Sequence, residues 1–583
     1  MRSLSLVLST AVTLLLSPAA AVQLSIPSAN YTVRAAIVRD TASLIANEPR
    51  DIFLDGASYA ISDGPVVRTN DSNKNASLYA EMVAYQDALM LWTENPKVHQ
   101  IHDAVEKLVS FDCHNLSEYH RVYSLLERAN LTQRPKALNI SDASFGARRL
   151  GIMGHNLQTV QSGGYASYLD QLSGELVHDV CDRDSIEAAV ANRSVFAADF
   201  SFMAQYAGDD DGDVEMREHT KNASVKYVPD VIGFFCLNKL RSVFLPLAIA
   251  IQDTKLLYTK NDTSADWMLA KMALDATELN HQMMQQYVEV HRLLVPIQVE
   301  MIRAMAPRHP VHALLEYHFA ANFAIENRSH ATLFSANSTF DQTFALGASG
   351  ALRFLMRTSE YTIDEGFHAE MSRKGLTDMP HRVARCGLVY YDAIQDFVGS
   401  YLEAFYANET EIVNDPELQN WALQTSKFPI LRGFPDKFKG FVDLKNILTN
   451  LVFQSTAKHH MLHGPTTWHG IAAPFTTPAL WNKPLPTRKG TKLNPLDYSM
   501  PVELLPILSE FAASAARPVP EHMSMLEAYS VAPFVNETKL ALPIMRFQKS
   551  MRKMEEWGSD WEQMADQFDS HVLPSKVPVF SYV

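Results

Sequence analysis

Residues 267–319 are the stretch that most constrains the fold of this 583-residue chain. Apolar residues recur there at helical spacing and hardly any Gly or Pro interrupts the first half, so the pattern predicts one long buried helix followed by a second. Of the chain's 21 histidines, about two would be expected in a stretch of this length. It holds five, namely His281, His291, His309, His312 and His318. This density indicates a metal-binding or proton-handling site inside a helical core.

Composition and charge narrow the class of protein. With 47% apolar residues, the chain can bury a large core. A formal charge of −14 without any strongly basic run argues against nucleic acid and against an anionic membrane surface. No apolar run reaches the roughly twenty residues of a membrane-spanning helix. We therefore expect a globular chain with no integral membrane segment, and a monomer.

The first 21 residues have the order of a secretory signal, with a charged Arg2, an apolar run over residues 4–16 and small residues at 19–21. We therefore expect residues 1–21 to be a cleaved signal peptide and residues 22–583 to form one domain. The chain also contains thirteen Asn-x-Ser/Thr sequons, among them Asn30, Asn75, Asn115, Asn130, Asn222, Asn408 and Asn536. The sequence thus predicts an N-glycosylated protein, secreted to the outside of the cell or to the secretory lumen.

Only four cysteines occur, Cys113, Cys181, Cys236 and Cys386, and their spacing is not that of metal ligands. One or two disulfides are compatible with this number. A chain of this size does not depend on them for stability.

Away from the central stretch the pattern is mainly helical. Residues 22–225 mix helical patterns with loops and show no evenly spaced short strands, so an N-terminal β-sandwich is not expected. Residues 240–252 are largely apolar with β-branched members, which predicts one short buried strand before the central helices. Six prolines between Pro474 and Pro501 predict an irregular surface crossing.

A second histidine cluster lies in the sequence LVFQSTAKHHMLHG. His459 and His463 are four residues apart, so a helix would present both on one face, where two imidazoles can hold one metal. His460 points about 100° away and is expected to be a neighbour. The spacing alone leaves two interpretations open, a metal pair or a packed pair of histidines.

The chain resembles the lipoxygenase family in several motifs that occur in the family's order. These are the WMLAK opening at Trp267, His281-Gln282, His291, His309-Pro310, His318, the upstream FLPLAI, the DQTFALGASGA run at 341–351, the His459/His463 helix and the terminal Val583. The resemblance covers about residues 235–583 and is greatest to the secreted fungal lipoxygenases that can use manganese. It implies a mainly α fold, a large helical domain around two long central helices, without an N-terminal β-barrel.

The resemblance also implies a metal site that holds one Mn or Fe ion. By position, His291, His459 and His463 resemble three of the family's ligands, and Val583 would supply the terminal carboxylate. The remaining central-helix histidine is replaced, because the corresponding places hold Gln286 and Tyr287. Gln286 would face the metal if the helix carries a π-bulge, which puts residues five apart on one face.

Two further departures concern the surroundings of this site. Val295 stands where the family usually has Glu, and Ser329 stands where the family has the Gly or Ala that helps decide the face of oxygen attack. Ser329 also completes the sequon Asn327-Arg328-Ser329, and a glycan would not fit inside a substrate channel. We assign Ser329 to the substrate and oxygen pocket by position only.

Two functions follow from the resemblance. The first is a dioxygenase that abstracts hydrogen from a polyunsaturated fatty acid or similar polyene and inserts O2 to give a hydroperoxide, with no catalytic residue beyond the metal site. The second is a lipoxygenase-fold protein with an altered or lost redox metal that binds or isomerises an apolar intermediate. Gln286 and Val295 favour the second, whereas the retained histidines and Val583 favour the first.

Overall fold

The computed structural model describes residues 141–581, apart from 152, 208–225, 241–242, 307–308, 357–361, 378, 380–381, 464–475, 506, 509–510, 512–518, 520, 532 and 565–571. The expected signal peptide, Cys113 and Val583 therefore lie outside the described residues. Among the helices that are described, none combines the length and the apolarity needed to cross a bilayer.

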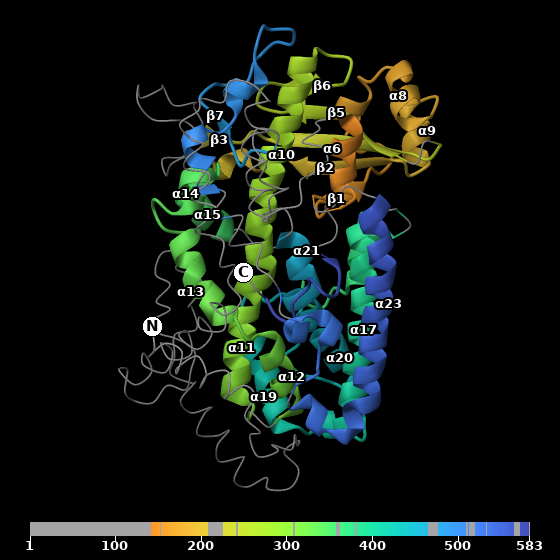
Figure 1. Ribbon diagram of the computed structural model, residues 1–583, viewed down its shortest axis with the longest axis vertical. Coiled ribbons are helices and arrows are strands. Elements are labelled where there is room, and N and C mark those ends of the chain that lie inside the picture. The colour runs from red at the N-terminus through yellow and green to blue at the C-terminus, as the bar shows by residue number, and fades with distance from the viewer. Residues whose placement is uncertain are drawn as a thin grey trace.

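One continuous helical run crosses the molecule (Figure 1). It begins at Thr263, whose side chain caps α10 (Ser264–Gln286), passes through the π-helical turn η3 (Tyr287–His291) and ends with α11 (Arg292–Ala304). Nearly all its side chains are buried. The next helix, α12 (Pro310–His318), starts with proline at its first position, where no backbone donor is lost. The predicted pair of central helices is confirmed.

A five-stranded antiparallel sheet covers the N-terminal part of this run, in the order β1-β2-β4-β5-β6. Its strands are β1 (Leu157–Thr159), β2 (Val195–Phe200), β4 (Val231–Asn238), β5 (Val243–Ile251) and β6 (Leu256–Tyr258). The strand predicted within 240–252 is confirmed as β5. The sequence did not predict β2 and β4, because they are buried on nearly all positions and so do not alternate between apolar and polar residues, nor β1 and β6, because three residues are too few to show a period.

The two faces of the sheet pack against different partners. Phe235 and Ile249 belong to the main core with α10, whereas Phe234 and Cys236 pack against α8 (Gly174–Cys181) and α9 (Ile186–Ala191). A disulfide joins Cys181 at the end of α8 to Cys236 on β4. Cys386 is also buried.

Gly233 on β4 marks the closest approach between the sheet and the central run. A Cβ atom there would lie 2.4 Å from Leu274 Cδ2 of α10. A side chain at this position would therefore require Leu274 and Phe235 to move.

The remaining helices include α6, which packs against β5, and α17 and α23, which lie side by side along one edge of the molecule (Figure 1). Their bounds are α6 (Asp142–Arg149), α7 (Ala166–Leu169), α13 (Asn322–Thr332), α14 (Thr339–Thr343), α15 (Gly347–Met356), α16 (Phe367–Lys374), α17 (Arg382–Phe405), α18 (Glu409–Val413), α19 (Pro416–Thr425) and α23 (Ala541–Met564). A second run that contacts both α17 and the central helices consists of α20 (Phe441–Phe453), the π-helical turn η4 (Gln454–Lys458) and α21 (His459–His463).

The proline-rich segment is irregular, as predicted, apart from a two-residue strand and a short turn. However, β7 (Leu480–Trp481) pairs with β3 (Lys226–Tyr227), and both residues of β7 are buried. The prediction that this segment crosses the surface is therefore wrong at β7, because the strand pairing carries it into the core.

A buried charge cluster fastens α6 to α10. Arg149 is fully buried and lies 2.6 Å from both Asp275 and Glu278, while Arg148 lies 2.6 Å from Asp275. Burial raises the pKa of Glu278 to about 7, because it outweighs the attraction of Arg149. Glu278 therefore charges in the folded protein only near neutral pH.

We expect this carboxyl group to make stability depend on pH. Its folded pKa lies above the ordinary value, so its contribution is fully present below about pH 4.5 and is lost as the pH rises through about 7. Glu278→Gln should remove up to about 3 kcal/mol of this pH dependence. Urea unfolding of both proteins between pH 5 and 8 measures it, and parallel pH profiles would contradict the assignment.

Candidate metal centre

The π-helical turn η3 brings Gln286 and His291 to one face of the central run. Five residues separate them, and the wide turn places the Gln286 Nε2 atom 2.9 Å from His291 Nε2. Both side chains are buried, with 4% and 1% exposed. The π-bulge required for Gln286 to share a face with His291 is thus present, whereas Tyr287 turns its hydroxyl to Glu326.

The second run brings His459 to the same point. His291 Nε2 lies 3.2 Å from His459 Nε2, and the two rings meet nearly at right angles. His463 stacks on His459 with an interplanar angle of 6° and centroids 5.6 Å apart, as expected for imidazoles one helical turn apart. His460 is partly exposed, in keeping with its predicted position beside this face.

The donors at this point suit a cation of the Mn or Fe type. A neutral imidazole nitrogen has one lone pair, so His291 Nε2 cannot accept from both the Gln286 amide and His459. If both imidazoles directed their lone pairs at a common cation, the three nitrogen atoms would not have to bond one another. Exchanging the oxygen and nitrogen positions of the Gln286 amide would then direct its oxygen at the cation. Imidazole nitrogen and amide oxygen are both ligands for Mn and Fe.

The described residues supply only part of a complete ligand set. Among them, no group of three or more His, Cys, Asp or Glu side chains is arranged to hold a metal ion. Two imidazoles and one amide are therefore the donors in direct contact, with the His463 ring stacked behind His459.

The C-terminal segment is fixed close to this point. His318 Nδ1 donates to the Val579 carbonyl at 2.6 Å, and His318 Nε2 accepts from Tyr529 Oη at 3.0 Å. The Ser581 hydroxyl donates to the carbonyl of Ser455, within η4. The described chain thus reaches the π-helical turn that directly precedes His459.

The five histidines of the central stretch do not form one cluster. Only His291 joins His459. His309 Nε2 bonds Asp415, His312 Nδ1 bonds the Met305 carbonyl, and His318 holds the C-terminal segment. These three histidines therefore make contacts within the fold, and only His291 of the five lies where Gln286 and His459 meet.

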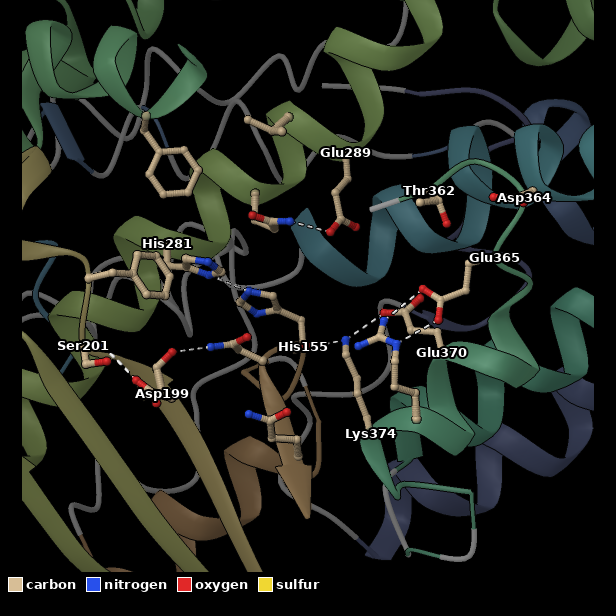
Figure 2. A pocket seen from close by; sticks show the side chains of 17 residues that line it. His155, Asp199, Ser201, His281, Glu289, Thr362, Asp364, Glu365, Glu370 and Lys374 are labelled. Atoms are coloured by element: carbon tan, nitrogen blue, oxygen red, sulfur yellow. Dashed lines mark hydrogen bonds and ion pairs between the residues drawn. The ribbon is translucent and has the colours of Figure 1, made fainter. Parts of the chain in front are cut away.

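His281 faces a different place, a cavity of about 760 Å³ on the other side of η3. Its Nδ1 atom lies 2.9 Å from His155 Nε2, and the two rings stack (Figure 2). Burial and the nearby Lys374 lower the pKa of His155 to about 3, so His155 is uncharged.

The walls of this cavity are polar. Glu289, Glu370 and Lys374 line it together with the histidine pair (Figure 2). Burial opposes the ionisation of Glu370, yet Lys374 and Lys458 together hold its pKa well below its usual range. The cavity therefore differs from the apolar channel that the resemblance implies. Neither His155 nor this set of charges carried a spacing signal in the sequence.

Ser329 lies on α13, which packs against η3 and α11. Its side chain is 6% exposed, and its hydroxyl donates to the Ile325 carbonyl one turn earlier. On the same helix, Glu326 accepts a 2.6 Å hydrogen bond from Tyr287. Burial raises the pKa of Glu326 to about 7.

Part of the chain is similar to known proteins. Residues 245–516 match the family model described as lipoxygenase. The allene oxide synthase-lipoxygenase protein of Plexaura homomalla is 25% identical over 346 residues, which are 55% of this chain and 32% of that protein. A manganese lipoxygenase of Colletotrichum gloeosporioides is 26% identical over 328 residues, 52% of this chain and 50% of that protein. The chain thus spans half or less of the length of these relatives.

Solved structures agree with this result. A structure of manganese lipoxygenase superimposes with a TM-score of 0.77 at 20% identity, covering 96% of this chain and 100% of that one. A lipoxygenase in complex with arachidonate gives 0.78 at 20% identity, covering 96% and 83%. The mainly α fold expected around two long central helices is confirmed. The chain thus contains a lipoxygenase domain, matched over residues 245–516, and shares the fold of these solved lipoxygenases.

Proposed function

We propose that the chain is a secreted dioxygenase that holds one Mn or Fe ion and converts a polyunsaturated fatty acid, or a similar polyene, with O2 to a hydroperoxide. The observation that carries the proposal is the meeting of Gln286, His291 and His459 where two π-helical turns cross. Lipoxygenases bind a single non-haem Mn or Fe ion, and dioxygenase chemistry is the activity of the family.

In this proposal His291, His459 and His463 hold the ion with Gln286 and the terminal carboxylate of Val583. The bound ion would supply the redox change that accompanies loss of a hydrogen atom from the substrate. The chain's own residues position the donors. Tyr287 packs its ring against His291, with centroids 5.8 Å apart, and is itself fixed by its bond to Glu326.

A second candidate rests on the donor change itself. An amide oxygen is a weaker donor than an imidazole, and Val295 adds an apolar side chain where the family usually has a carboxylate. A chain with this site would bind its metal weakly and act on an apolar intermediate without net oxygenation. The substrate then remains a small apolar molecule in both cases, and O2 is a co-substrate only in the first.

Metal analysis and the variant Gln286→His distinguish these functions. We expect the purified parent to contain about one equivalent of Mn or Fe and to consume O2 with linoleate. Gln286→His should bind the ion about tenfold more tightly, because imidazole is the better donor. A metal-free, inactive parent whose variant gains both properties would instead establish the second function. If the variant binds metal no better than the parent, Gln286 does not face the ion.

The histidine assignments have a matched control one residue away. His459→Ala should lower metal occupancy by at least about tenfold, since even the loss of an outer partner has effects of this size. His460→Ala should leave occupancy unchanged, because its partly exposed side chain points away from this face. Deletion of Val583 tests the terminal carboxylate in the same assay. Equal losses from both alanine variants would contradict this register.

Secretion is supported by the exposure of sequon asparagines. Those at 192, 261, 337, 408 and 536 are all exposed. We expect protein from the native host to begin near Val22 and to lose mass when treated with a glycosidase. Protein that retains Met1 and does not change in mass would contradict this proposal.

A further inference from the structure

Two further contacts join the π-helical turns η3 and η4. Gln454 is the first residue of η4, and its Nε2 atom donates to the Glu289 carbonyl at 2.7 Å. Lys458 is the last residue of η4, and its Nζ atom lies 2.9 Å from Glu289 Oε2. Glu289 is the middle residue of η3. Both ends of η4 are thus attached to the centre of η3.

The ion pair is largely buried and belongs to a row of alternating charges. The side chains of Lys458 and Glu289 are 6% and 14% exposed. Lys458 also lies 3.2 Å from Glu370, which lies 2.7 Å from Lys374. The four side chains alternate in sign and sum to zero. Removing one member leaves a buried charge without compensation, which is far more costly than removing a matched pair.

Glu289 and Lys458 are near neighbours in sequence of His291 and His459. Glu289 precedes His291 by two residues, and Lys458 immediately precedes His459. A π-helical turn holds one more residue than an α-helical turn, so its conversion to α-helix would rotate the following residue by about 100°. That rotation would carry either imidazole away from the other. The register of both turns therefore decides whether the two nitrogens meet.

We propose that Glu289 and Lys458 are positioning residues, whose ion pair holds the two π-helical turns in the register that brings His291 to His459. The consequence for the metal rests on the proposed function. The coupling of the two turns does not, because its contacts are made by protein atoms alone.

The first experiment measures how readily full-length holoprotein loses its metal to EDTA. Lys458→Met and Glu289→Gln should each release the ion at about 10- to 100-fold lower chelator concentration, the usual effect of losing an outer partner. Lys458→Arg should retain the ion, because it keeps the charge between Glu289 and Glu370. The double variant should be no worse than the more severe single variant, since the two residues act as one unit.

A matched control for Lys458 is available on α10 of the central run. Lys271 lies 2.9 Å from Asp142, and its side chain is 7% exposed. Its ion-pair distance and its burial are thus close to those of Lys458. It lies twenty residues before His291, so Lys271→Met should destabilise the fold without changing metal release. If Lys458→Met releases the ion no more readily than Lys271→Met, the positioning role is wrong.

The second experiment needs no metal and separates this inference from the proposed function. Hydrogen exchange measured by mass spectrometry should accelerate in peptides covering 452–463 when Glu289→Gln is introduced, and in peptides covering 283–292 when Lys458→Met is introduced. Lys271→Met should change neither. Unchanged exchange across the pair overturns the inference, whatever the metal content. If the parent binds no metal and the variants still exchange faster than the parent, the coupling of the two turns is supported and only the proposed function is contradicted.

Discussion

The crossing of two buried helical runs, each interrupted by a π-helical turn, is the constraint on which the site depends. A regular α-helix presents residues three and four apart on one face, so Gln286 and His291 would not share a face without the wide turn. The turn η4 lies directly before His459 in the same way. At η3, the Glu289 carbonyl accepts from the Gln454 side chain across the crossing, and the Glu289 side chain pairs with Lys458.

The sheet and the surrounding helices hold this crossing from opposite directions. At one end, Gly233 lets β4 approach α10 closely, and the Arg149 cluster fastens α6 to the same helix. At the other end, His318 holds the C-terminal segment in place through both of its ring nitrogens. The central run is therefore fixed along its length, so that a local change of register at η3 cannot be relieved by a shift of the whole helix.

The sequence predicted the elements that have a strong period and failed where the period is absent. The central run and its second helix follow from apolar spacing, β5 follows from an apolar run with β-branched members, and the shared face of His459 and His463 follows from their four-residue separation. The short strands β1 and β6 do not, because three residues cannot display a period. His309 and His318 are of a residue type that often binds metal, and only the tertiary contacts show that they bond Asp415 and Val579. Lys458 carried no signal either, since a buried lysine is recognised only once its carboxylate partners are known.

In the proposed metal centre, the amide of Gln286 stands in place of an imidazole, and this changes what the other contacts of the site have to provide. Amide and neutral imidazole carry the same charge, so the substitution alters donor strength while leaving the electrostatic balance of the crossing unchanged. With a weaker donor, the binding of the ion releases less free energy, so it stabilises the arrangement of the two helical runs less. The positioning must then come from contacts that exist before any ion binds, namely the Glu289–Lys458 pair, the Gln454 bond and the attachment of Ser581 to η4. These contacts order the two helical runs before an ion binds, so the entropy cost of ordering does not reduce the affinity for the ion. A weak donor such as an amide can then still serve as a ligand.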